Sequence, residues 1–152
     1  MDEILQLVRT TDDRDQMIDD IDEFEKAQFL GGNRKDGLYK KINSENLKIL
    51  RQYADDPEAL KKLRNDLLDL EIVRVTISYE PSVSTVDMVS SWARENLKRD
   101  VLVSFDIDKN IEGGAVISFR GKYANLTIKD QLEIYFRDNR DLLIEKIQSA
   151  KP

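Results

Sequence analysis

The chain of 152 residues contains no cysteine and no histidine. The lack of cysteine excludes disulfides, thiolate nucleophiles and thiolate metal ligands, and it fits a reducing compartment. The lack of histidine removes the side chain that serves most often as a general acid or base and as a metal ligand. Both absences lower the expectation of an enzyme, although carboxylate, serine and lysine chemistry stays open.

Long apolar runs are also missing, because no stretch of the sequence approaches the roughly 20 residues that a membrane-spanning helix needs. The first residues, MDEILQLVRTTDD, are acidic where a secretory signal peptide is basic. We therefore expect a soluble, cytoplasmic protein that does not insert directly into a membrane.

Charge is distributed unevenly along the chain. Residues 1–30 carry ten acids and three bases, a net charge of −7, whereas residues 31–152 carry twenty acids and twenty-one bases, a net charge of +1. Phosphate contacts need lysine and arginine, so the first region is not expected to bind nucleic acid. Its acids suit either a basic partner or a well-solvated helix face.

Apolar residues recur at helical spacing in the first part of the chain. A short helix is predicted over residues 2–9, and a second begins at Thr10 or Thr11, where a hydroxyl can cap free backbone N–H groups. Three glycines between residues 31 and 37 end this helix and predict a hinge.

Two further helices are predicted before residue 71. Ser44 is expected to cap the first, and Asp55 or Asp56 the second, with Pro57 in its first turn. The period of the apolar residues then changes to two, which predicts strands at Val73 to Tyr79 and at Val101 to Ile107.

A helix that begins near the Ser84–Asp87 start signal separates these two strands. A third strand, a short fourth strand and a last helix follow, so the second part reads β-α-β-β-α. We predict an α+β fold with a helical region over residues 1–70 and an α+β domain over residues 71–150.

Glycines mark the predicted turns of the second part. Gly113 and Gly114 open the third strand, and Gly121 makes a tight turn into the fourth. Gly121-Lys122 also resembles the end of a phosphate-binding loop, but the glycine spacing is wrong and Tyr123 stands where serine or threonine is needed. Structural turns are therefore the favoured interpretation.

Alternating acids in the segment DIDKNIEGG invite a calcium-loop interpretation. The pattern fails at its sixth and twelfth positions, which are Ile111 and Ile117 instead of glycine and glutamate. Turn chemistry explains the same residues, since Asp and Asn side chains bond to their own backbone. No metal ligand is predicted.

Carboxylates are abundant in residues 12–25, but no two are singled out as a pair in a shared apolar pocket. We nominate no catalytic residue and no cofactor. A carboxylate-based enzyme that acts on a cationic small molecule at this acidic face remains an alternative.

The second part resembles the C-terminal domain of the delta subunit of F-type ATP synthases, the counterpart of the oligomycin-sensitivity-conferring protein. The resemblance covers roughly residues 71–136 and rests on the segments VRVTISYEP, VDMVSSWARENL, DVLVSFDID, IEGGAVISFRGKYANLT and IKDQLEIYF. Gly113 and Gly114 match the paired glycines of the family, and Asn125 and Thr127 stand where it usually has Asp and Ser. Asn and Thr side chains can cap a helix in the same way as Asp and Ser.

The resemblance implies a non-catalytic stator subunit that couples the peripheral stalk to the catalytic head. Its C-terminal domain would meet the ends of the b-subunit helices, and the protein would lie at the inner face of the cell membrane through the complex. The family's six-helix N-terminal domain receives the N-terminal segments of alpha subunits, but only about four helices fit into the first 70 residues here. Contact with alpha would therefore need a reduced bundle.

A connector of this kind needs exposed apolar positions on its helices. The residues expected to contact partners are Tyr135, Phe136 and Leu143 on the last helix, and Ile18 and Phe24 in the first region. An adaptor of another ATPase, such as a secretion or flagellar export system, is the alternative that uses the same module.

Overall fold

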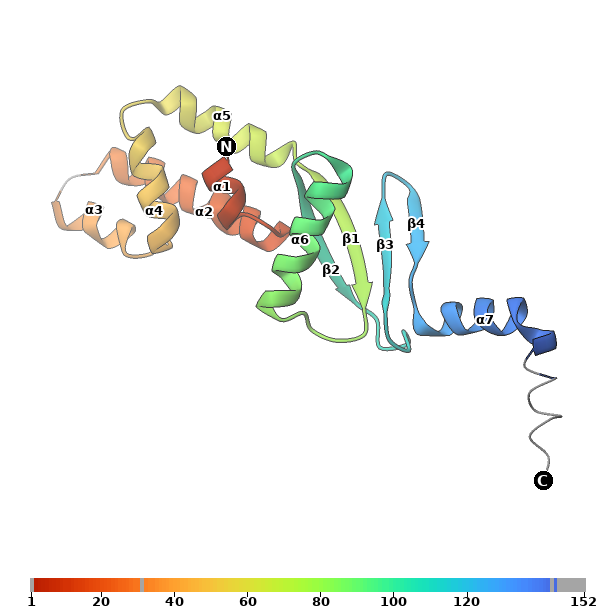
Figure 1. Ribbon diagram of the computed structural model, residues 1–152. Coiled ribbons are helices and arrows are strands. Elements are labelled where there is room, and N and C mark those ends of the chain that lie inside the picture. The colour runs from red at the N-terminus through yellow and green to blue at the C-terminus, as the bar shows by residue number, and fades with distance from the viewer. Residues whose placement is uncertain (1, 31, 143, 145–152) are drawn as a thin grey trace. The chain divides into compact units, whose positions relative to one another are not determined.

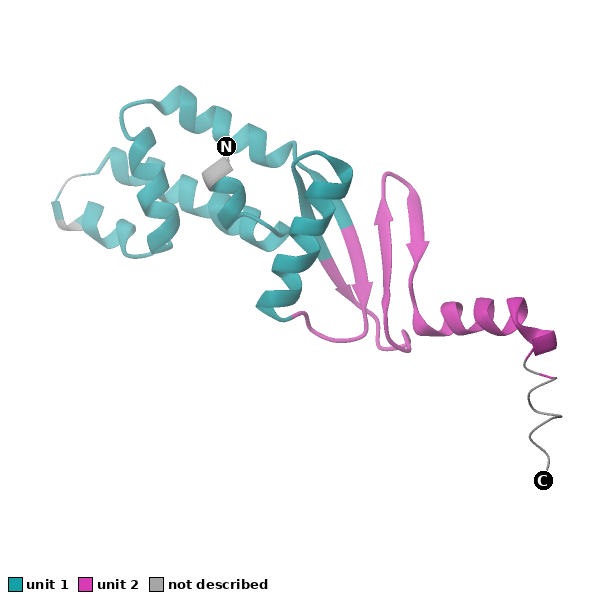
Figure 2. Ribbon diagram, in the orientation of Figure 1, with its two compact units in different colours: residues 1–73, 82–104 teal, residues 74–81, 105–152 magenta. Residues whose placement is uncertain are grey.

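The computed structural model of the protein describes residues 2–30, 32–142 and 144, and the chain has an α+β fold (Figure 1). It divides into two compact units, which we call unit 1 (residues 1–73 and 82–104) and unit 2 (residues 74–81 and 105–152) (Figure 2). This division differs from the expected boundary at residue 70, because helix α6 (Val83–Leu97) groups with the N-terminal helices.

Unit 1 is built mainly from helices packed around one apolar core. In chain order they are α1 (Asp2–Leu7), α2 (Thr11–Gln28), α3 (Gly32–Tyr39), α4 (Ser44–Leu50), the 3-10 helix η1 (Arg51–Tyr53), α5 (Pro57–Leu68) and α6. The core contains side chains of α1, α2, α4 and α5, together with Leu102. Burial of one such side chain stabilises a fold by about 1.5–3 kcal/mol, so this cluster is the main source of stability in unit 1.

Side-chain caps begin the helices of unit 1. Thr10 forms a capping box with Asp13, and Asp56 caps α5 directly before Pro57, as the sequence predicts. Two predicted caps are wrong. Asn43 caps α4 in place of Ser44, and Ser82 caps α6 in place of Ser84.

The predicted hinge between residues 31 and 37 is also wrong, because Gly32–Tyr39 form helix α3. Two glycines make this segment a poor helix former. Its last residue is held by the core, since the ring of Tyr39 stacks on that of Phe24 at 5.8 Å between centroids. Tertiary packing therefore outweighs the local preference.

The strands are β1 (Glu71–Ile77), β2 (Val101–Ile107), β3 (Ala115–Phe119) and β4 (Lys122–Asn125), in the sheet order β2-β1-β3-β4. Strand β3 runs antiparallel to β1, with Ile77 opposite Ala115, and antiparallel to β4, with Phe119 opposite Lys122. Arg120 and Gly121 join β3 to β4 with φ values of 49° and 74°. Two positive φ angles give the two-residue turn that suits the twist of a hairpin.

Unit 2 ends in helix α7 (Ile128–Asp138). None of the described helices in the chain is both long and apolar enough to span a membrane.

Candidate interaction surface

A short turn after β4 fixes the start of α7. The side chain of Asn125 accepts a hydrogen bond from the backbone N–H of Thr127 at 3.1 Å, and the hydroxyl of Thr127 accepts one from Asp130 N–H at 3.4 Å. Thr127 is the predicted cap of this helix and is buried. The two residues at the motif positions of the resemblance therefore do the capping.

The Gly113–Gly114 turn also holds the segment that leads into α7, through backbone hydrogen bonds. Leu126 N–H donates to Ala115 O at 2.8 Å, and Ile128 N–H donates to Gly113 O at 3.2 Å. Both glycines have positive φ, 82° and 81°. A Cβ atom on Gly114 would lie only 2.3 Å from Leu126 O, so no other residue fits there without moving the backbone that leads into α7.

The preceding loop is closed by turn chemistry. The Asp108 carboxylate accepts hydrogen bonds from Asn110 at 2.9 Å from the backbone and 2.8 Å from the side chain. This is the local bonding that the DIDKNIEGG segment predicts.

Helix α7 itself has no buried residue among those the structure describes. Four of its apolar side chains recur at helical spacing and share one side of the helix, whereas Ile134 falls on another side. We call these four the α7 face, which consists of Ile128, Leu132, Tyr135 and Phe136. Their exposed fractions lie between 48% and 55%, so about half of each side chain meets solvent.

The residues predicted to contact partners differ widely in how exposed their side chains are. Tyr135 and Phe136 are 51% and 55% exposed, and their rings meet edge to face at 6.1 Å. Ile18 is half-buried on α2, and Leu143 lies outside the described residues. The expectation for Phe24 is corrected, because its side chain is 0% exposed in the core of unit 1 and cannot contact a partner.

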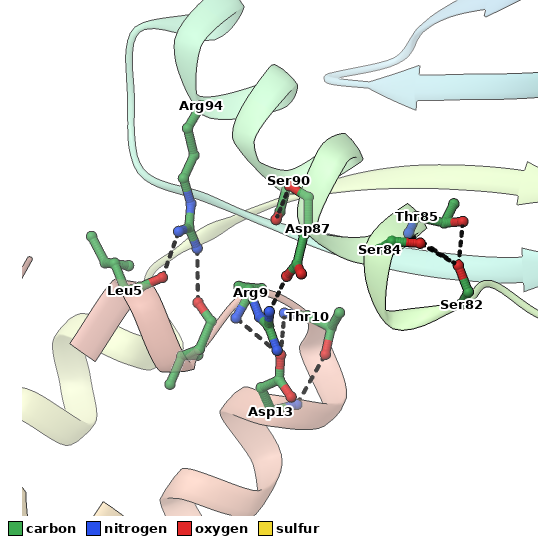
Figure 3. Close-up of polar contacts among 11 residues, drawn as sticks. Leu5, Arg9, Thr10, Asp13, Ser82, Ser84, Thr85, Asp87, Ser90 and Arg94 are labelled. Atoms are coloured by element: carbon green, nitrogen blue, oxygen red, sulfur yellow. Dashed lines mark hydrogen bonds and ion pairs between the residues drawn. The ribbon is translucent and has the colours of Figure 1, made fainter. Parts of the chain in front are cut away.

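A polar network in unit 1 joins α6 to the first residues of the chain (Figure 3). The Arg94 guanidinium donates to Leu5 O at 2.5 Å, to Val8 O at 2.7 Å and to Val101 O at 3.2 Å. Leu5 lies in the last turn of α1 and Val8 directly after it, where backbone carbonyls lack a partner within the helix. Burial lowers the pKa of Arg94 below its ordinary value.

Arg9 extends this network by pairing with Asp87 of α6, while the carboxylate of Asp13 accepts from the backbone N–H groups of Arg9 and Thr10 (Figure 3). Arg94 itself lies in the last turn of α6. Two of the three carbonyls that Arg94 contacts, those of Leu5 and Val8, lie more than 80 positions away in the chain, and local patterns carry no signal for them.

The acidic segment of α2 is divided between surface and core. Asp12, Asp15 and Asp19 are exposed, whereas Asp20 is buried and accepts from amide groups of Gln16, Asn43 and Asn46 at 2.8–3.2 Å. Within the described part of the chain, no three acidic side chains are grouped closely enough to hold a metal ion.

Comparison with protein-family models and with curated proteins finds no match for this chain.

Proposed function

We propose that this chain is a non-catalytic peripheral-stalk subunit of an F-type ATP synthase, which links the catalytic head to the b-subunit helices. The resemblance over residues 71–136 is the source of this proposal. It is supported by the order of the elements after residue 71, which is β1-α6-β2-β3-β4-α7. It is also supported by the glycine pair and the two capping residues that anchor the start of α7.

The observation that carries the proposal is the α7 face. An amphipathic helix with no buried residue leaves apolar area in water, and the hydrophobic effect favours covering it. A partner helix can cover such a stripe by side-chain packing of the coiled-coil kind. A rigid attachment of α7 at Gly113–Gly114 would suit a connector that is held under rotor torque.

In this proposal the chain takes part in ATP synthesis and hydrogen ion transport only through the complex. It would lie at the inner face of the cell membrane without entering the bilayer. Residues 1–70 would then be a reduced counterpart of the N-terminal domain of the family, facing the N-terminal segments of alpha subunits.

Binding to helices of a b-type stalk tests the proposal. The full chain should capture the C-terminal part of a dimeric b-type subunit at micromolar concentration. The double substitution Leu132→Asp with Phe136→Asp places two charges in the α7 face and should weaken capture at least about tenfold. Val83→Asp with Met88→Asp is the matched control, because both residues are exposed apolar side chains on α6.

Failure of the unmodified chain to bind at micromolar concentration would remove the proposal. Equal loss in both double variants would show that α7 is not the contact. Capture of the stalk helices of a secretion or flagellar export ATPase instead would favour the alternative adaptor role.

A further inference from the structure

Unit 1 separates its charges between neighbouring helices. Residues 11–28 of α2 contain eight acids and two bases, whereas residues 32–53 contain two acids and six bases. The six cations, which we call the basic surface, are Arg34, Lys35, Lys40, Lys41, Lys48 and Arg51. Five of them are exposed, and Lys35 is half-buried.

The basic surface is not neutralised inside the protein. Among the residues that the structure describes, none of its six cations forms an ion pair with a carboxylate. Four arginines elsewhere in unit 1 do form such pairs, namely Arg9, Arg14, Arg64 and Arg99. Glu23 of α2 pairs with Lys26 and is influenced by the charge of Lys41 only from a longer distance, since both cations lower its pKa but, among the described residues, only Lys26 forms an ion pair with it.

Two of these cations lie close to the ring of Tyr39. Lys35 Nζ lies 5.6 Å and Arg51 Cζ lies 5.9 Å from the centroid of its ring. The ring in turn stacks on the buried Phe24, so it is fixed by the core. Cation–π attraction holds both charges beside one aromatic ring, and acidic groups that approach this ring are attracted by both cations.

We propose that the basic surface binds an acidic segment of a partner protein, a short stretch rich in aspartate and glutamate. Carboxylates fit the guanidinium of Arg51 and the ammonium of Lys35 through charge-assisted hydrogen bonds. This inference does not depend on the stalk function, because it uses only contacts within unit 1.

The charge of the surroundings favours a protein segment over a membrane or a nucleic acid. Unit 1 carries 21 acids and 15 bases, a net charge of −6. The Phe24–Tyr39 stack joins the basic surface to the acidic helix α2. A lipid bilayer or a duplex extends well beyond six side chains and would meet these carboxylates, whereas a short peptide contacts the basic surface alone.

Fluorescence anisotropy with a labelled glutamate-rich peptide and the full chain tests this proposal. The peptide should bind at low salt and lose most of its affinity at about 150 mM NaCl, where charges are screened beyond about 8 Å. Lys35→Glu with Arg51→Glu should weaken binding at least about tenfold. The matched control, Lys61→Glu with Lys62→Glu, makes the same charge change on exposed α5 residues and should alter affinity less than about twofold.

Circular dichroism establishes that each variant is folded. If the first double variant unfolds, Lys40→Glu with Lys48→Glu tests the same surface away from the Tyr39 ring and should also weaken binding. The proposal is overturned if the peptide does not bind at low salt, or if the α5 control weakens binding as much as the basic-surface variants. Binding of anionic phospholipid vesicles or of single-stranded RNA in preference to the peptide also overturns it.

The two proposals fail separately. The variant Leu132→Asp with Phe136→Asp should keep full affinity for the acidic peptide while it loses the stalk helices. Loss of peptide binding in that variant would contradict the assignment of the acidic segment to unit 1.

Discussion

Unit 1 and unit 2 use their apolar residues in opposite ways. The largest fully buried side chains of the described structure, such as Phe24, Met17 and Leu67, all belong to unit 1. In unit 2 the side chains of α7 are about half exposed, and the start of this helix is fixed by backbone hydrogen bonds and two glycines. Burial therefore holds unit 1 together, whereas unit 2 leaves apolar area for another molecule to cover.

Matched leucine truncations give the largest expected contrast. Leu67→Ala should destabilise the protein by about 2–5 kcal/mol, because it leaves a cavity in the core of unit 1. Leu132→Ala, on the α7 face, should change stability by less than about 0.5 kcal/mol. Denaturant unfolding followed by circular dichroism measures both, and equal losses would contradict the difference between the units.

Two glycines of unit 2 test whether the start of α7 depends on close backbone contact. Gly114→Ala should cost about 1–2 kcal/mol for its positive φ, and more because the new Cβ would meet Leu126 O. Gly121 also has positive φ, but a Cβ there meets nothing within 4 Å.

Gly121→Ala is therefore the control, and it should show the conformational cost alone. Amide NMR shifts of residues 126–130 should move in the Gly114 variant and stay unchanged in the control. Identical shifts in both variants would show that the glycine pair does not position α7.

The features of the fold that the sequence predicts correctly depend mostly on interactions between residues close together in the chain. The hydroxyls of Thr10 and Thr127 and the carboxylate of Asp56 cap helices as expected, because each bonds to backbone only a few residues away. The alternation of Val73, Val75 and Ile77 with exposed Arg74 follows from the pleat of β1.

Apart from the two helix caps, the predictions that failed concern residues whose position is set by distant partners. Helix α3 exists although its glycines oppose it, because Tyr39 packs on Phe24. Phe24 has the same helical spacing as a docking residue would have, and only the surrounding helices make it core. Periodicity identifies an apolar face without showing what covers it, so it predicted the α7 face and misjudged Phe24 by the same reasoning.

Arg94 is expected to have a smaller effect than the Leu67 change. Arg94→Leu removes the donor to three backbone carbonyls, and unsatisfied carbonyls cost about 1–3 kcal/mol. Arg137→Leu is the control, because Arg137 is exposed in unit 2 and pairs only with its neighbour Asp138. Hydrogen exchange of residues 4–10 should increase in the Arg94 variant alone; unchanged exchange would show that the guanidinium does not hold this segment.

The smallest effect concerns an ion pair at the surface of unit 1, between Lys26 and Glu23 of α2. The hydrogen bond from Lys26 lowers the pKa of Glu23 below 4.5, and the same bond raises the pKa of Lys26 above 10.5. Glu23 therefore adds to the free energy of unfolding at neutral pH, and this stabilisation is lost as the pH falls through its lowered pKa. The stabilisation from Lys26 is lost as the pH rises through its raised pKa. Glu23→Gln should lower the melting temperature slightly at pH 7 and leave it unchanged relative to the unmodified chain at about pH 2, where the carboxyl is protonated in both folded and unfolded chains. Glu25→Gln removes the same charge from α2 without an ion pair in the described structure, so a pH-dependent difference as large in this control would assign the effect to net charge rather than to the pair.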